Sequence, residues 1–295
     1  MPNVLRRIGR HVAVIPIVAI ASYFLIAALP LGAEDESKRQ LPPELVASYR
    51  RDLGIGQPLG FLRPWQKLVR GERLGTSAQG VTGEELVCKI SGSVGVGCLA
   101  LGLSLVWALG FALLRLQLQR PRASAISDVI PAIAFGTPVF IPALLLAPYV
   151  AEAGHLLPEL AAALVISAWP GVFLGTLLID AIRTELTRDY VRTALGKGLG
   201  SSAVLRRHVI PNVLPLLLDS IGPVATALLA GSFAAERVFG LPYFGQLYVV
   251  AVLQKQVAVV VVATTCFAAL LAAVGLTVEV VRILIDPRAR AATDA

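Results

Sequence analysis

Long apolar stretches dominate the pattern of hydrophobic and polar positions along this chain of 295 residues. Six of them have about 20 residues or more, the length that a helix needs to cross roughly 30 Å of hydrocarbon. They are residues 12–31, 92–114, 129–150, 156–179, 213–235 and 257–278. The pattern predicts an all-α polytopic membrane protein with six transmembrane helices.

Composition and charge support this class and orient the chain. Hydrophobic residues make up 56% of the chain and charged residues only 15%, whereas soluble domains average about 25% charged residues. The net charge of +7 does not indicate nucleic-acid binding, because the basic residues lie at the ends of apolar stretches. Arg6, Arg7 and Arg10 precede the first stretch, and six basic residues separate the fourth from the fifth. The positive-inside rule then places both termini in the cytoplasm.

The connection after the first stretch is predicted to be external. Residues 32–91 contain nine basic and eight acidic residues, and a segment of this length translocates largely regardless of its charge. Apolar residues at helical spacing predict short helices near residues 41–53 and 61–69. We therefore expect an N-terminal tail and retained first helix (1–31), an external segment (32–91) and a five-helix core (92–295).

Prolines predict that two of the helices are bent. The third stretch contains Pro131, Pro138, Pro142 and Pro148. Each proline removes a backbone donor and kinks a helix, so this helix is not expected to be a straight rod. The pair Pro170–Gly171 predicts a further bend in the fourth helix.

The richest polar connection lies between the fourth and fifth stretches. Residues 183–212 include six basic and two acidic residues, hence a net charge of +4. Apolar residues alternate with charges from 183 to 193, which predicts a helix that runs out of the bilayer. Gly196 and Gly198 are expected to end it, because glycine supplies the left-handed turn that closes helices.

A second short helix is expected to follow in this connection. Ser201 or Ser202 is the candidate N-cap for a helix over residues 203–210, and Pro211 is expected to break or kink that helix. The predicted product is a compact, basic helix-turn-helix that projects from the membrane.

This connection also carries a resemblance to a known family. Asp189 to Leu199 is similar to the sequence D-Y-V-R-T-A-x-A-K-G-L found in ABC importer permeases of the dipeptide, oligopeptide and nickel transport family, with Gly196 in place of an alanine. Arg207-His208 and Asn212 are similar to that family's R-H-x-x-x-N. Residues 236–245 resemble its outer re-entrant loop, E-x-V-F-x-x-P-G-x-G.

Further segments agree with the resemblance. Residues 136–140 and 155–158 are similar to the third and fourth spans of that family, and residues 41–44, 49–54 and 57–59 resemble the first permease of its heterodimeric pair. Residues 70–75 and 254–258 depart from the family sequences G-D-L-G and N-R-D-Y-P. Both departures lie on the predicted outer side.

The resemblance implies a type I ABC importer permease in the bacterial inner membrane that performs no bond chemistry itself. It implies a second permease subunit, two ABC ATPase subunits and an external substrate-binding protein as partners. The chain has no Walker A motif, G-x-x-x-x-G-K-[ST], so ATP and Mg²⁺ are expected in the ATPases, with no cofactor or metal bound here. Peptides are the default cargo; nickel complexes, glutathione and opines or other small solutes stay open.

The resemblance also assigns candidate site residues. It predicts an ATPase-coupling loop within 183–212 and an outer re-entrant loop, and we expect a side chain at Gly198 to obstruct the coupling turn. The coupling residues are Asp189, Tyr190, Arg192, Thr193, Ala194, Gly196, Lys197, Gly198 and Leu199. The outer-loop residues are Glu236, Phe239, Pro242 and Gly245.

Asp219 is a separate candidate, because it lies about two turns inside the fifth stretch. A carboxylate at membrane depth is costly and suggests function. Two interpretations stay open: it faces the pore and attracts the amino end of a peptide, or it hydrogen-bonds Ser220 or a neighbouring helix.

Two rival functions come from other classes. An ion-coupled secondary carrier works without an ATPase, but six spans are few for one and the halves show no inverted repeat. An intramembrane enzyme is the other rival, but the spans contain no paired aspartates, no H-E-x-x-H and no Ser/His pair at matching depth.

Overall fold

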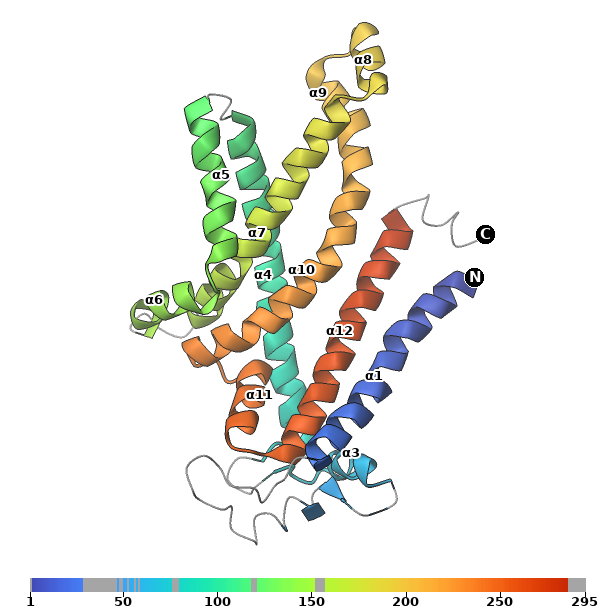
Figure 1. The fold of residues 1–295 in the computed structure, drawn as a ribbon, viewed down its shortest axis with the longest axis vertical. Helices are drawn as coiled ribbons and strands as arrows, with labels where there is room; N and C mark the ends of the chain where they lie inside the picture. Colours follow the sequence, from blue (N-terminus) through green and yellow to red (C-terminus); the bar gives the residue numbers. More distant parts are fainter. Residues whose placement is uncertain are drawn as a thin grey trace. The chain divides into compact units, whose positions relative to one another are not determined.

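The computed structural model describes residues 2–28, 47, 50–51, 53–55, 57, 59–75, 80–117, 121–151 and 157–285. Within these residues the chain is helical apart from turns and one isolated antiparallel bridge, Leu74 with Val81. The all-α prediction is therefore confirmed. The helices shown in Figure 1 are α1 (Pro2–Ala28), η1 (Gly60–Leu62), α3 (Arg63–Val69), α4 (Gly83–Gln117), α5 (Pro121–Gly136), α6 (Phe140–Ala151), α7 (Leu157–Leu186), α8 (Asp189–Gly196), α9 (Ser201–Val204), the π-helical η2 (Leu205–Val209), α10 (Ile210–Phe239), α11 (Phe244–Leu253) and α12 (Val257–Ile285).

Five of the described helical stretches are long and apolar enough to cross a membrane, and the pair α5–α6 makes a sixth if it counts as one span. The two halves of this pair meet at an angle of 82°. The break includes Pro138, whereas Pro131 and Pro148 lie inside helices. The third span is therefore broken, as predicted, at one of its four prolines.

The chain forms two compact units. Unit 1 comprises Met1–Gly92 and Pro242–Leu276, and unit 2 comprises Ser93–Leu241 and Thr277–Ala295. Helices α4 and α12 each contribute residues to both units. The boundaries predicted from the sequence, at residues 31 and 91, stay a prediction.

Small residues let α7 approach α4 closely inside unit 2. A Cβ atom on Gly171 would lie 2.4 Å from the Trp107 Cβ, and one on Gly175 would lie 2.7 Å from the Ala108 carbonyl oxygen. One turn earlier, the Ser104 hydroxyl donates to the Ser167 carbonyl at 3.2 Å. Small residues at a spacing of four commonly form such contacts between membrane helices. Gly171 therefore serves packing, and α7 continues as one helix through the predicted bend.

In unit 1, hydrogen bonds anchor the start of α4. The backbone N–H of Glu85 donates to the Thr82 hydroxyl, and the N–H of Thr82 donates to a Glu85 carboxylate oxygen, at 3.3 and 3.1 Å. This reciprocal pair is a capping box, which satisfies donors that the first helical turn leaves open. Arg73 adds an ion pair to the same carboxylate at 3.0 Å. The predicted helix over 61–69 is present as η1 and α3, whereas most of the one near 41–53 lies outside the described residues.

The loop that precedes α11 also packs on α4 in unit 1. The Lys89 ammonium donates to the Pro242 carbonyl at 2.8 Å, and a Cβ on Gly92 would lie 2.2 Å from the ring of Tyr243. Tyr243 stands where the family sequence has a glycine. In this chain, Gly92 leaves the space that the larger ring occupies.

We predict that Gly175→Ala destabilises the protein. The new methyl group would press on the backbone of Ala108, which cannot move aside as a flexible side chain can. The expected loss is about 1–3 kcal/mol of unfolding free energy, measured as the thermal unfolding midpoint in detergent. Gly110→Ala in α4 is the control, because nothing lies within 4 Å of its Cβ position. That change should be neutral or stabilise by up to about 1 kcal/mol. Equal thermal unfolding midpoints for the two variants would contradict the close packing of α7 on α4.

Candidate functional site

The connection between α7 and α10 is built differently from the helix-turn-helix that the sequence predicts. The exit helix α7 ends at Leu186, and a break at Thr187–Arg188 separates it from α8. Arg188 has an extended backbone (φ −70°, ψ 147°), so the prediction of one continuous helix over 183–193 was wrong. The alternation of charges and apolar residues continues across the break, and thus gave no sign of it.

Gly198 forms the turn after α8, as the sequence predicts. Its φ of +85° lies in the left-handed region that favours glycine, while Gly196 is the last residue of the helix. No atom lies within 4 Å of a Cβ built on Gly198. A side chain here would meet no neighbouring atom but would strain the left-handed backbone, and the expected sensitivity of the turn to substitution at Gly198 stays a prediction.

The second half of the connection continues directly into α10. Gly200 is the N-cap residue of α9 and makes no side-chain capping bond, so the prediction of a serine cap was wrong. The π turn η2 joins α9 to α10, with the Ile210 N–H donating to the Leu205 carbonyl five residues back. Pro211 lies in the first turn of α10, where its missing N–H is tolerated. The predicted break at Pro211 is replaced by a π turn just before it.

A small hydrophobic core fixes the connection to the ends of both long helices. Val191 and Ala194 of α8 are buried against Ile182 of α7, Val204 of α9 and Val209 of η2. The exposed fractions of these five side chains range from 0 to 7%. The segment is therefore a packed element with its own interior.

A chain of hydrogen bonds adds a polar tie across this core. The Tyr190 hydroxyl donates to the Glu185 carboxylate at 2.6 Å, which joins α8 to the end of α7. The Asn212 amide donates to the Tyr190 oxygen at 3.3 Å and to the His208 carbonyl at 2.8 Å, which joins α8 to the start of α10. We call Glu185, Tyr190 and Asn212 the tyrosine clasp.

The environment of the clasp raises the pKa of Tyr190 above its ordinary value of 10.0, chiefly because burial disfavours the charged phenolate and also because it bonds to Glu185. A group whose folded-state pKa is raised stabilises the fold below its unfolded pKa and loses that contribution as the pH rises through the folded value. The clasp is therefore intact at neutral pH and weakens only above about pH 10.

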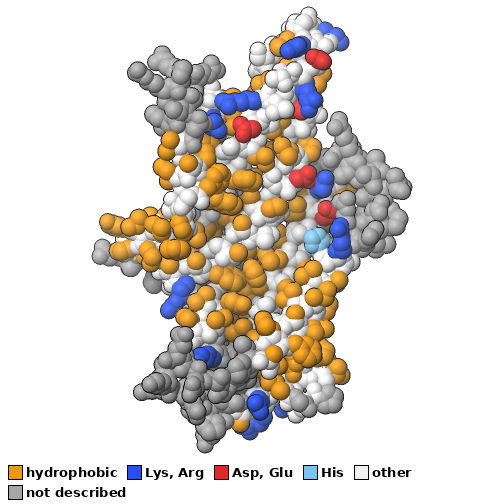
Figure 2. Space-filling model, in the orientation of Figure 1, with side chains coloured by type: hydrophobic (Ala, Val, Ile, Leu, Met, Phe, Trp, Pro, Cys, Tyr) orange, Lys and Arg blue, Asp and Glu red, His pale blue; other side chains and the backbone are white. Residues whose placement is uncertain are grey.

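The opposite face of α8 is open. The side chains of Asp189 and Arg192 are 98% and 77% exposed, and Leu195 is 46% exposed. Figure 2 shows charged side chains gathered at the end of unit 2 that α8 and α9 form. We call the exposed residues of this segment the α8 face: Asp189, Arg192, Thr193, Leu195, Gly196, Lys197 and Gly198.

The predicted coupling residues thus divide into two groups. Tyr190, Ala194 and Leu199 turn inward and belong to or pack against the small core, whereas the other predicted residues lie on the α8 face. Sequence reasoning missed Leu195, an exposed apolar side chain among polar ones. Helical spacing gives no signal for it, because Leu195 lies four residues after the buried Val191, a spacing that places both on the same side of a helix.

Asp219 forms an ion pair in the structure. Its carboxylate lies 3.1 Å from the Arg282 Nε, so it joins α10 to the end of α12. Ser220 donates instead to the Leu216 carbonyl in its own helix. Three residues further along α10, a Cβ built on Gly222 would lie 3.6 Å from the Val278 side chain. Asp219 and Gly222 therefore lie on a helix face that packs on α12 within unit 2.

The predicted outer-loop residues lie at the junction of α10 and α11. Glu236, fully buried, and Phe239 belong to the last turn of α10, which Gly240 closes with a φ of +69°. Gly245 is buried in α11, a helix of 10 residues that is too short to cross a membrane. Among the described residues, no cluster of His, Cys, Asp and Glu suits a metal ion.

We predict that Tyr190→Phe loosens the connection without unfolding the protein. The ring keeps its packing, but both hydrogen bonds of the hydroxyl are lost, which costs about 1 kcal/mol. Amide hydrogen exchange in residues 189–200 should become roughly fivefold faster. Thr193→Val is the control, because the Thr193 hydroxyl bonds only within α8, to the Asp189 carbonyl.

The pH dependence provides a second measurement of the clasp. After correction for intrinsic rates, the wild-type connection should lose protection above about pH 10, and Tyr190→Phe should not show this change. Identical exchange in both proteins across that range would contradict the clasp.

Comparison with known proteins identifies the chain at the level of its family. The family model described as "Binding-protein-dependent transport system inner membrane component" matches residues 104–291, well over half of the chain and all of 183–212. The oligopeptide transport system permease protein OppB of Escherichia coli (strain K12) is 25% identical over 304 residues, which cover 97% of this chain and 98% of that protein.

Other similarities are more local or concern the fold alone. The dipeptide transport system permease protein DppB of Lactococcus lactis is 33% identical over 106 residues, or 36% of this chain. This alignment and one to the DppB of Bacillus subtilis span only 35% and 39% of those relatives' own lengths. A chain of the inward-facing MetNI methionine ABC transporter shares the fold, with a TM-score of 0.55 and 14% identity over 68% of this chain and 96% of that one.

The family match agrees with the multi-pass helical fold and with the resemblance seen in the sequence, and it disfavours the carrier and enzyme alternatives. The prediction of an importer permease subunit is confirmed. The chain belongs to the family of binding-protein-dependent transport system inner membrane components.

Proposed function

We propose that this chain forms half of the translocation path of an ATP-driven peptide importer in the bacterial inner membrane, and that the α8 face docks on an ABC ATPase. The similarity to a named oligopeptide permease over 97% of the chain supports peptides as the cargo. The observation that carries the docking role is a rigid, packed connection whose outer face stays open.

The partner set follows from the same proposal. A second permease completes the path, two ATPases bind ATP and Mg²⁺, and an external protein delivers the peptide. The basic connection 183–212 supports a cytoplasmic location for the α8 face, because positive charge marks cytoplasmic loops. The external segment 32–91 then faces the binding protein.

The tyrosine clasp gives the proposed docking a route into the membrane. Since Tyr190 is tied to Glu185 of α7 and to Asn212 of α10, a displacement of α8 acts on both long helices. The Asp219–Arg282 pair continues the connection from α10 to α12. We infer that Asp219 serves as this link between helices. Coupling between the ATP site and the path is then a free energy carried by packed elements.

Isolation of the assembly tests the proposed function as a whole. The tagged chain is purified in mild detergent, the proteins recovered with it are identified by mass spectrometry, and peptide uptake is measured in proteoliposomes. We expect a second permease, a Walker-containing ATPase and uptake that requires ATP. A chain that moves solute alone without ATP would establish a carrier and overturn the proposal.

We predict that Leu195→Asp uncouples the permease from its ATPase. A carboxylate in place of a central apolar contact should weaken ATPase recovery at least about tenfold, while helicity and thermal midpoint stay unchanged because the side chain is half exposed. Val69→Asp is the matched control: Val69 is an exposed apolar residue, 89% accessible, in α3 of the external segment. Normal ATPase recovery with Leu195→Asp would show that the α8 face is not the docking surface.

A further inference from the structure

The break between α5 and α6 leaves backbone acceptors open. Pro138 has no N–H to offer the Ala134 carbonyl, which lies four residues earlier. The Ile133 carbonyl accepts from both the N–H and the hydroxyl of Thr137, at 3.0 and 2.7 Å. Within the described part of the chain, the carbonyls of Ala134, Phe135 and Gly136 have no hydrogen-bond donor.

The end of α5 also lacks the usual cap. Helices often close with a left-handed glycine that lets later N–H groups bond the last carbonyls. Gly136 is the last residue of α5, but it is not among the glycines with positive φ. Open carbonyls within an apolar span are tolerated only where they are buried in protein or line a cavity that admits polar groups.

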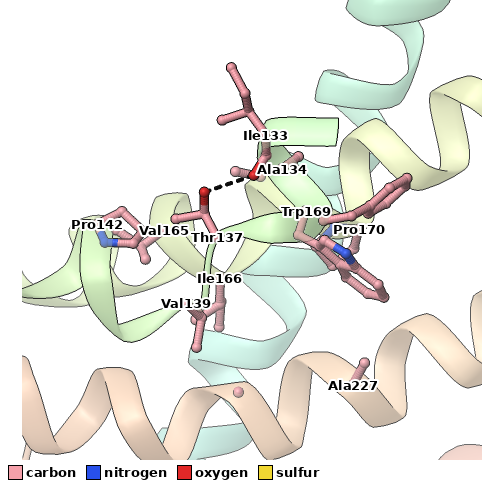
Figure 3. Close-up of a pocket in the computed structure, with 13 residues that line it drawn as sticks. Ile133, Ala134, Thr137, Val139, Pro142, Val165, Ile166, Trp169, Pro170 and Ala227 are labelled. Carbon is pink, nitrogen blue, oxygen red and sulfur yellow. Dashed lines mark hydrogen bonds between the residues drawn. The ribbon is translucent and has the colours of Figure 1, made fainter. Parts of the chain in front are cut away.

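A cavity of about 390 Å³ lies beside this break, entirely within unit 2. Ala134, Phe135 and Thr137 line it from the break, Trp169 from α7 and Ala227 from α10. Figure 3 shows the break above and α10 below, with Trp169 on one side and Pro142 on the other. The cavity therefore combines open backbone acceptors with apolar walls.

An aromatic cluster forms one wall of the cavity. The Trp169 ring meets the Phe135 ring edge to face, at 5.9 Å between centroids, and stacks on Phe173 at 5.9 Å with an interplanar angle of 7°. Trp169 and Phe135 nevertheless remain 39% and 47% exposed. Large aromatic faces left open beside hydrogen-bond acceptors favour a ligand that brings both an apolar group and N–H donors.

We propose that this break is a substrate subsite of the translocation path. It receives one large apolar side chain of a transported peptide against Trp169 and Phe135, and the open carbonyls of the break accept amide N–H groups of the same peptide. The peptide is favoured as occupant over an acyl chain because hydrocarbon cannot donate hydrogen bonds to these carbonyls. The proposal rests on the importer function proposed above.

Filling the cavity from α10 tests the side-chain part. Ala227 lines the cavity and its side chain is exposed. Ala227→Leu therefore reduces the volume of the cavity without placing new atoms between packed helices. Ala230→Leu is the matched control, because Ala230 is exposed on the same helix but does not line the cavity. Each variant is purified with its partner subunits, reconstituted with the same binding protein and assayed for ATP-driven uptake of Gly-Phe-Gly and Gly-Gly-Gly.

We expect Ala227→Leu to lower Gly-Phe-Gly uptake about tenfold relative to Gly-Gly-Gly, since a Phe ring gains roughly that much from a fitting apolar site. The control should keep the wild-type ratio. An unchanged ratio in Ala227→Leu, or an equal loss of both peptides, overturns the subsite. Gly231→Leu, from the same wall, repeats the test at a second position.

Pro138→Ala tests the backbone part. The new N–H can bond the Ala134 carbonyl and continue the helix. Uptake of both peptides should fall at least about fivefold, because both use the same acceptors, while ATPase recovery stays normal; the factor corresponds to one lost hydrogen bond. Wild-type uptake by this variant overturns the role of the carbonyls. If the wild-type assembly moves neither peptide with ATP, the importer function itself fails, which is a different result from a loss confined to the variants.

Discussion

Every backbone N–H and C=O group that crosses hydrocarbon must find a partner inside the protein, and this requirement shapes the chain more than any single contact. Regular helices satisfy it along nearly all of the five long apolar stretches. The informative positions are the few at which the regular bonding pattern is interrupted. Two of them involve a proline: the break at 137–139 contains Pro138, and the π turn at 205–209 ends two residues before Pro211.

These two interruptions are resolved in different ways, and the difference bears on function. Before Pro211 one turn is π-helical, and the Ile210 N–H donates to the Leu205 carbonyl five residues earlier. The helix therefore continues into the apolar span without a break. The second half of the connection 187–209 is therefore continuous with α10, and the tyrosine clasp joins the connection to α7. At Pro138 the helix instead stops and turns by 82°, and carbonyls remain open beside a cavity. The first arrangement suits transmission of movement, and the second suits contact with a passing molecule.

The sequence alone was sufficient for the fold class, the spans and the position of the polar connection between α7 and α10. Length and apolarity determine where helices cross a membrane, and a glycine with left-handed φ closes α8 at Gly198, as predicted. The details of the connection were not predictable in the same way. The break at Arg188 lets Val191 and Ala194 pack against Val204 and Val209 of the following helices, and Asp219 finds its ion-pair partner 63 residues away at Arg282. Local propensity contains no information on such contacts. The spacing of Ser167, Gly171 and Gly175 was readable as a packing seam, but proline beside glycine pointed more strongly to a bend.

The most direct test of the central claim, that the open face of α8 contacts an ATPase, is site-specific photo-crosslinking. A photoreactive amino acid is placed at Leu195 in the full-length chain, membranes are irradiated, and the captured protein is identified by mass spectrometry. A second chain with the same group at Val69 reports capture from the segment that we propose to be external. If the α8 face docks on an ATPase, position 195 captures a protein with a Walker A motif and position 69 does not. Capture at position 195 of lipid alone, or of a protein without a nucleotide site, would contradict it.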